Sequence, residues 1–405
     1  MLSTKILSSG IPGISSRISK DNEKLILVLG RKGGTGKSQF VINLLYVLSE
    51  IFKEINGKLL GIDIDKQNNL LNYYQTNLDE NQPAYTFIEE IKEDTNKNKI
   101  YRVLKDTEKM KKLILRSRII NSIKAQDPDQ KYIDSTVDIL ADFATYLSNM
   151  QSTSHEKFIK NIKDIPGYAL KIVDISGGDD SEQLFHFIKT AVDLGTELFF
   201  ITHLNKDTND GLAIQLYKLL EVMGKNINKA KIRFVYQKYH EEFYKKIYKK
   251  IMHGKEKSEK EYHENVTKQF ISATSKKLCA KYNKSHPDRP PLDFDFSKFP
   301  IYRIPNAADY DFHIALKLIY SKFNPRSEIA RTYYKIAHEL AQEMLGVVHI
   351  STIKDRKWMI AFETPENPNQ KFLKWRKDSL TEDLVKGIGG QELLDLWKKS
   401  KPFLS

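Results

Sequence analysis

Short runs of apolar residues alternate along much of this chain with segments in which apolar residues recur every three or four positions. The apolar runs are LILVLG at 25–30, GKLLGIDID at 57–65, YALKIVDISGG at 168–178, TELFFITHL at 196–204, KIRFVYQKY at 231–239 and FPIYRIPNA at 299–307. Continuous apolar runs of this length are typical of strands buried on both faces. Helical spacing follows several of them, as in KSQFVINLLYVLSEIF, where Phe40, Leu44 and Val47 share a face. Strands that alternate with helices predict an α/β fold with a doubly wound, mostly parallel sheet.

Segments of different character interrupt or follow this pattern. Residues from about 70 to 168 are polar, with apolar stripes such as MKKLILRSRIINSI and VDILADFATYL, and we expect a helical insertion there. A basic segment at about 238–290 is also expected to be helical. Residues 347–405 carry all three tryptophans and are expected to form a C-terminal extension. With a flexible leader at 1–23, where Ser, Gly and Pro are scattered, the main domain would occupy 24–346.

The net charge of the chain indicates which classes of partner it attracts. The 405 residues include 65 Lys and Arg against 52 Asp and Glu, a formal net charge of +13. Residues 238–289 hold fourteen basic against seven acidic side chains, so over half of the net charge lies there. Such a segment is attracted to nucleic acid or to an anionic membrane surface, although a solvated helix face has the same composition.

Cysteine content and hydropathy indicate the compartment. Cys279 is the one cysteine, which excludes an internal disulfide and favours a reducing, cytoplasmic setting. The sequence contains no apolar run of about eighteen residues, so we expect no membrane-spanning helix. The ten histidines show no zinc-ligand spacing.

The stretch GRKGGTGKS at 30–38 carries the strongest chemical signal. It is a variant of G-x-x-x-x-G-K-[ST], because Arg31 stands where the first glycine belongs. Lys37 would reach the β- and γ-phosphates of a nucleotide, and Ser38 would offer its hydroxyl to Mg²⁺. A helix N-terminus behind the loop favours the anion. The backbone groups expected to cradle the phosphates belong to Gly33, Gly34, Thr35 and Gly36.

Several stretches together resemble the deviant Walker A ATPases of the ParA/MinD family. They are KGGTGKS, INLLYVL, GKLLGIDIDKQNN, IVDISGGDD, FFITHLNKD and YRIPNAADY, and the resemblance covers roughly 24–70 and 168–345. It implies a sheet of the P-loop NTPase type that uses ATP and Mg²⁺. It also implies slow ATP hydrolysis, stimulated by a partner protein, and a homodimer that forms with ATP.

The resemblance assigns roles to four charged residues. Lys32 would reach across the dimer to the partner subunit's nucleotide, where it offsets the repulsion between two facing triphosphates. Asp65 would orient the attacking water. Asp174 would hold Mg²⁺ through water, and Asp63 would support the ion from outside its inner coordination sphere.

Four residues bear on nucleotide contacts, and two of them depart from the family pattern. Gln39 stands where the family carries a Thr that contacts the α-phosphate. Gln237 stands near the end of a strand where the family places an Asn that reads adenine. Pro305 and Asn306 belong to the stretch that resembles the family's adenine-packing loop.

The family performs several functions, and three remain open. The leading hypothesis is a ParA-like partition ATPase, which binds DNA without sequence preference and segregates or positions it with a ParB-like partner. Its DNA contacts would come from Lys245, Lys246, Lys249 and Lys250, in a segment where tyrosines alternate with lysines. The first alternative is a MinD-like membrane-positioning ATPase that uses GGQELLDLWKKSKPFLS at the C-terminus, although a membrane partner is not favoured. The second is an accessory ATPase of conjugation or mobile elements.

Overall fold

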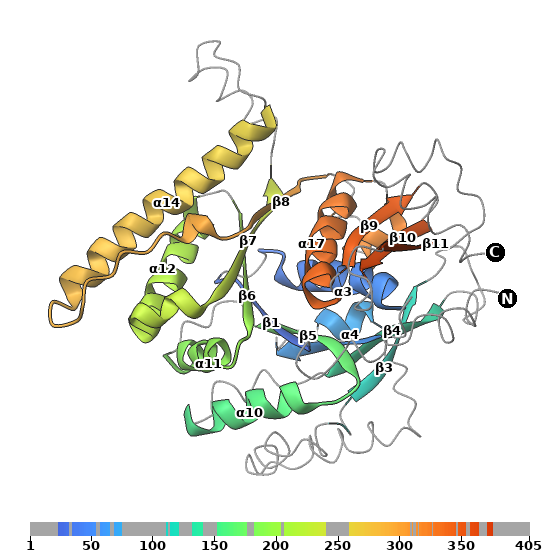
Figure 1. Ribbon diagram of the computed structural model, residues 1–405, viewed down its shortest axis with the longest axis horizontal. Coiled ribbons are helices and arrows are strands. Elements are labelled where there is room, and N and C mark those ends of the chain that lie inside the picture. The colour runs from blue at the N-terminus through green and yellow to red at the C-terminus, as the bar shows by residue number, and fades with distance from the viewer. Residues whose placement is uncertain are drawn as a thin grey trace.

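A central sheet with helices on both faces organises the protein (Figure 1). The computed structural model describes residues 23–31, 35–53, 57–64, 69–74, 111, 114–120, 132–140, 152–175, 182–203, 206–239, 259–307, 310, 313–314, 316–325, 327–345, 347–353, 357–363 and 371–375.

Within these described residues the central sheet has eight strands in the order β3-β4-β2-β5-β1-β6-β7-β8. Neighbouring strands run parallel throughout except for β3 and β4, which are antiparallel. The fold class predicted from the sequence, a doubly wound and mostly parallel sheet, is therefore confirmed. The strands are β1 (Lys24–Leu29), β2 (Lys58–Ile64), β3 (Ile114–Ile120), β4 (Tyr132–Leu140), β5 (Tyr168–Ile175), β6 (Glu197–His203), β7 (Lys231–Tyr239) and β8 (Ile301–Pro305).

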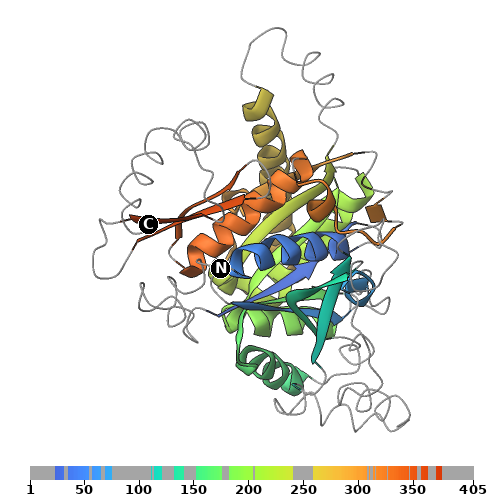
Figure 2. The ribbon, with the colours of Figure 1, turned by 90° about the vertical axis from the view of Figure 1, so that its right-hand side faces the viewer.

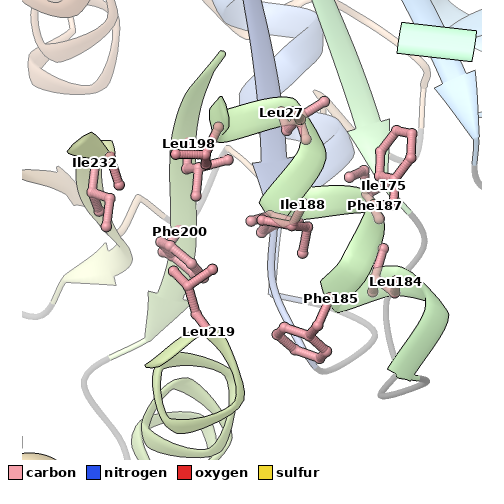
Figure 3. Packing of buried hydrophobic residues seen from close by; sticks show 14 of the residues in the cluster. Leu27, Ile175, Leu184, Phe185, Phe187, Ile188, Leu198, Phe200, Leu219 and Ile232 are labelled. Atoms are coloured by element: carbon pink, nitrogen blue, oxygen red, sulfur yellow. The ribbon is translucent and has the colours of Figure 1, made fainter. Parts of the chain in front are cut away.

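Helices cover the sheet as two separate layers (Figure 2). One face packs on α3 (Lys37–Lys53), α4 (Asn69–Tyr73), α16 (Tyr320–Phe323) and α17 (Glu328–Leu345). The other packs on α10 (Ser152–Asp164), α11 (Glu182–Asp193), α12 (Lys206–Met223) with the short η2 (Gly224–Lys229), α14 (Glu259–Ser285) and η3 (Phe296–Lys298). Figure 3 shows part of this second layer, where Phe185 and Ile188 of α11 lie near Leu27 and Phe200 of the sheet.

The expectation of a helical insertion at about 70–168 is wrong for two segments, because β3 and β4 lie within it. In β3 the buried side chains are Leu115, Ser117 and Ile119, which alternate with more exposed ones in the period of a strand. The buried Ser117 hydroxyl donates a hydrogen bond to the carbonyl of Val137 in β4. A polar residue on the buried face hides this alternation from the sequence. Helix α10 does occupy the end of the same region.

Two further segments lie beyond the sheet. The basic segment is helical over 259–285, where α14 runs alongside α12 and extends outward (Figure 1). After α17 the chain enters β9 (Val347–Ile353), β10 (Lys357–Glu363) and β11 (Lys371–Trp375). Within the described part of the C-terminal extension these strands form an antiparallel sheet in the order β11-β10-β9. Among the helices that the structure describes, none has the length and apolar character that crossing a bilayer demands.

An ionic cluster, buried at Arg233 and Glu197 and partly exposed at Glu339 and Glu343, connects α17 to the amino-terminal end of the strands. Arg233 of β7 donates to Glu197 of β6 and to Glu343 of α17, and it lies 3.3 Å from Glu339. Lys24 of β1 contacts Glu197 and Glu343 as well. Burial would raise the pKa of Glu343, but hydrogen bonds and charge from Lys24 and Arg233 hold it below its ordinary value.

Candidate nucleotide-binding site

The P-loop follows β1 and leads into α3 at the carboxyl edge of the sheet, the edge where open α/β sheets bind ligands. Lys37, the second residue of the motif's Gly-Lys pair, is 5% exposed. Its side chain passes so close to Gly30 that a Cβ there would lie 3.0 Å from Lys37 Cγ and Cδ, and 2.9 Å from the carbonyl of Ile201. Gly30 therefore makes room for the lysine, although it lies outside the strict motif.

Gly36 takes a backbone conformation that only glycine adopts readily, with φ of +81°. Its carbonyl accepts the first helical hydrogen bond of α3, from the N–H of Phe40 at 2.8 Å. The buried side chain of Gln237, at the end of β7, donates to the same carbonyl at 3.4 Å and to the hydroxyl of Tyr333 at 3.4 Å. The phosphate-binding turn is thus bonded to Gln237 of β7, and through Gln237 it is linked to α17.

Two buried carboxylates lie side by side where β2 and β5 end. Asp63 and Asp174 are register partners on adjacent parallel strands, and both are 0% exposed. Strand alternation places them on the face that α3 covers, together with Leu59 and Ile172. Asp63 Oδ2 accepts the N–H of Leu70 at 2.8 Å, which fixes this carboxylate against the start of α4.

The residues present fit a magnesium ion held with nucleotide phosphates. Mg²⁺ in such sites keeps several waters and needs one or two carboxylates besides the phosphates. Ser38, in the first turn of α3, presents its Oγ to the amide of Asn69 at 3.3 Å. Ser38, Asp63 and Asp174 would hold the ion, which would supply charge neutralisation at the phosphates. Within the described residues, no group of three or more His, Cys, Asp or Glu side chains forms a metal site of protein ligands alone.

Gln39 makes its side-chain contact within the protein. Its Nε2 donates to the hydroxyl of Tyr73 at 2.6 Å, and that hydroxyl donates to the carbonyl of Ile314 at 3.1 Å. The backbone carbonyl of Gln39 accepts the amide of Asn43 at 2.9 Å. The side-chain partner of Gln39 therefore comes from α4, and only Tyr73 contacts the segment after β8.

The remaining residues predicted from the sequence divide into two groups. Thr35 is buried in the loop, Pro305 ends β8 half-buried, and Asn306 is exposed directly after it. The others lie outside the described residues, so their predicted roles are untested. They are Lys32, Gly33, Gly34, Asp65, Lys245, Lys246, Lys249 and Lys250.

The structure adds neighbours of the loop that the sequence analysis did not single out. Arg31 lays its side chain against Gly211 of α12, where a Cβ would stand 3.4 Å from Arg31 Cβ and Cδ. A small pocket beside this contact is lined by Thr35, Thr202 and Gln215 among others. Asn69 ends the stretch GKLLGIDIDKQNN, but the sequence does not indicate the hydrogen bond from its side chain to Ser38, 31 residues away.

Comparison with known proteins gives a family match and distant structural likenesses. The model of an AAA-domain family matches residues 23–178. No curated protein matches the sequence. The MinC:MinD cell division protein complex of Aquifex aeolicus is similar at 13% identity with a TM-score of 0.45, over 78% of this chain and 95% of that chain. The ATP complex of a McdA variant from Cyanothece has 13% identity and a TM-score of 0.44, over 80% and 97%. The structure of pNOB8 ParA has 13% identity and a TM-score of 0.44, over 80% and 99%.

Proposed function

We propose, from the match of residues 23–178 to an AAA-domain family and from the resemblance to ParA/MinD ATPases, that this chain binds and slowly hydrolyses Mg·ATP. The observation that carries the proposal is the Lys37 side chain, which is buried, folded across Gly30 and followed directly by the N-terminus of α3. A positioned cation at a helix N-terminus is a binding site for phosphate. Asp63 and Asp174 lie together at the same edge of the sheet, as magnesium coordination requires.

The proposed catalytic cycle is a switch between monomer and dimer. Lys32 of each subunit reaches the phosphates bound by the other subunit, so ATP favours the dimer and hydrolysis releases it. Asp65 orients the attacking water from the loop after β2. A protein partner, ParB-like in a partition system, stimulates the hydrolysis.

The cargo in this proposal is DNA, bound through its phosphates without sequence preference. Helix α14 supports this role, because it continues the basic segment and carries exposed lysines on its outer side. Together with the preceding lysines between 245 and 250, these side chains would follow a phosphate backbone. The exposed lysines of α14 include Lys268, Lys276, Lys277 and Lys284.

Nucleotide binding is tested by calorimetry on two variants of one residue. Lys37→Ala removes the charge and the packing against Gly30, whereas Lys37→Met keeps most of the packing. Hydrogen bonds to a charged group contribute about 1.5–3 kcal/mol, so both variants should bind Mg·ATP roughly tenfold to a hundredfold more weakly. Equal affinity in wild type and Lys37→Met would refute the phosphate-binding role of this lysine.

DNA binding is tested with matched charge reversals. Lys276→Glu/Lys277→Glu on α14 and Lys157→Glu/Lys160→Glu on α10 change the net charge equally, and all four side chains are exposed. Only the α14 pair should weaken ATP-dependent DNA binding, and it should reduce the salt slope by about 2. The quadruple change of the lysines at 245, 246, 249 and 250 to Glu should abolish binding.

The alternatives predict different outcomes in the same assays. ATP-dependent flotation with anionic liposomes, without DNA binding, would favour the MinD-like membrane role. DNA binding that falls equally with the α10 and α14 pairs would show that only net charge matters, and the α14 surface would be rejected.

A further inference from the structure

Two glutamines near the P-loop, Gln39 and Gln237, each donate to a tyrosine hydroxyl, and each tyrosine contacts the chain that follows β8. Gln39 donates to Tyr73 at 2.6 Å, and Tyr73 donates to the carbonyl of Ile314 at 3.1 Å. Gln237 donates to Tyr333 at 3.4 Å, and the hydroxyl of Tyr333 lies 3.3 Å from that of Tyr310. We call each of these glutamine-to-tyrosine connections a relay. Both relays begin at the P-loop or the first turn of α3, and both end between residues 310 and 314.

We propose that Gln39 and Gln237 are positioning residues, which tie the phosphate-binding turn to the segment after β8 and act on bound nucleotide only through that tie. The proposal rests on the nucleotide site proposed above. It differs from direct contact with the α-phosphate or the base.

The hydrogen-bond directions support this role for Gln39. A side-chain amide carries both of its donor hydrogens on one nitrogen, and one of these hydrogens in Gln39 is donated to Tyr73, which holds the nitrogen toward α4. Burial raises the pKa of Tyr73, and the hydrogen bond from Gln39 offsets only part of that effect. The phenol is therefore protonated at neutral pH, and its hydroxyl can donate a hydrogen bond to the carbonyl of Ile314.

Gln237 is held in the same way from the other side of the turn. The carbonyl of Gly36 can only accept, which fixes Nε2 as the atom that faces it. A Cβ on Gly36 would lie 3.3 Å from Cδ of Gln237, so the amide packs directly on the turn. Burial raises the pKa of Tyr333 to about 12, with hydrogen bonds from Tyr310 and Gln237 opposing the rise, so this hydroxyl also remains protonated.

Because of this arrangement, loss of a relay should change the binding affinity for a nucleotide, which has a base, but not for a phosphate chain without a base. Pro305 and Asn306, proposed to meet the base, begin the segment that the relays reach. A break in a relay would let this segment shift relative to Gly36, while the P-loop itself keeps its lysine and backbone donors. Affinity for ATP should then fall, and affinity for a phosphate chain without a base should not.

The test uses Gln39→Met, Tyr73→Phe and the double variant, with Tyr74→Phe as a matched control. Tyr74 is the adjacent buried tyrosine, and its hydroxyl donates to the carbonyl of Ile42 at 2.8 Å instead of joining a relay. Calorimetry measures affinity for Mg·ATP and for magnesium tripolyphosphate, which lacks a base. Thermal unfolding without nucleotide confirms that each variant folds.

We expect each relay variant to bind Mg·ATP about fivefold to tenfold more weakly and tripolyphosphate within about twofold of wild type, since one buried hydrogen bond is lost. The double variant should match either single variant, because both break one relay. Tyr74→Phe should bind both probes as wild type does.

Three results would overturn the proposal. Additive losses in the double variant would show that Gln39 contacts the nucleotide directly. Wild-type ATP affinity in Tyr73→Phe, or an equal loss in Tyr74→Phe, would show that the relay has only a structural role. If the wild type binds neither probe, the proposed nucleotide site fails and this role fails with it.

Discussion

Gly30→Ala should weaken nucleotide binding, although Gly30 lies outside the strict P-loop pattern. The new Cβ would stand 2.9 Å from the carbonyl oxygen of Ile201 and 3.0 Å from Cγ and Cδ of Lys37. The carbonyl belongs to β6, which is paired with β1 and β7 and cannot move cheaply. The lysine stem must therefore give way, and its ammonium group moves with it.

The structure sets the expected size of both effects. Overpacking of a well-packed site costs about 1–3 kcal/mol, so the nucleotide-free protein should unfold at a lower temperature. Misplacement of Lys37 removes part of a charge-assisted contact with phosphate, and a loss of about 1.4 kcal/mol there would weaken Mg·ATP binding tenfold. Calorimetry at one temperature, together with thermal unfolding, measures the two effects separately.

Gly61→Ala provides the matched control in β2. Its Cβ would stand 2.9 Å from Cδ1 of Ile139 and 3.0 Å from Cδ1 of Leu45, which is similar crowding away from the P-loop lysine. Stability should fall in both variants, but ATP affinity should fall only in Gly30→Ala. If Gly30→Ala is destabilised yet binds Mg·ATP as tightly as Gly61→Ala does, the argument that Gly30 positions the lysine is wrong.

Further predictions address the dimer, the ionic cluster and pH. Lys32→Ala should still bind nucleotide but remain monomeric with ATP in light scattering, whereas Asp65→Ala should accumulate an ATP-bound dimer; a mass independent of nucleotide in both would contradict the switch. Arg233→Met should lower the free energy of unfolding by about 3 kcal/mol, because the buried Glu197 then keeps only Lys24, at 3.5 Å, as a cationic partner. Adding Glu197→Gln should recover part of that loss in denaturant titrations, and no recovery would refute the explanation. The pKa of Glu343 is lowered on folding, so its stabilisation is present above the ordinary value of 4.5 and is lost as pH falls through the lower, folded value. Glu343→Gln should therefore flatten the loss of stability as pH falls below the ordinary value, and an unchanged slope would contradict the assignment.

The pattern of apolar residues predicted the parallel strands at the centre of the sheet. It did not predict β3, where a polar residue lies on the buried face. β1, β2 and β5 to β8 coincide with continuous apolar runs, because both faces of these strands are covered by helices. β3 is an edge strand with Ser117 on its buried face and Arg116 and Arg118 nearby, so its alternation resembles that of a polar helix. The strand exists because β4 supplies a hydrogen-bonding partner, and a sequence window does not contain that information.

In the candidate site, too, the sequence indicates residues that belong to local motifs, but it does not indicate contacts between residues far apart in the chain. Lys37 and Ser38 follow from a local motif, and Asp63 and Asp174 follow from the ends of apolar strands. The tyrosines that hold the two glutamines are 34 and 96 residues away in sequence. Only the packed layers bring them together, so the sequence marked Gln39 and Gln237 as departures without indicating their partners.

The position of β1 has a consequence for how the protein is made. The strand that carries the P-loop leaves the ribosome well before its two sheet neighbours, β5 and β6, which begin at Tyr168 and Glu197. At a synthesis rate of roughly 5–20 residues per second, β1 waits for something like 10–30 seconds without a strand on either side. Its apolar residues, from Leu25 to Leu29, are buried in the folded protein and lack their sheet neighbours during that interval. We therefore expect nascent chains that end before Glu197 to bind no nucleotide, because the proposed site then lacks a strand that flanks β1.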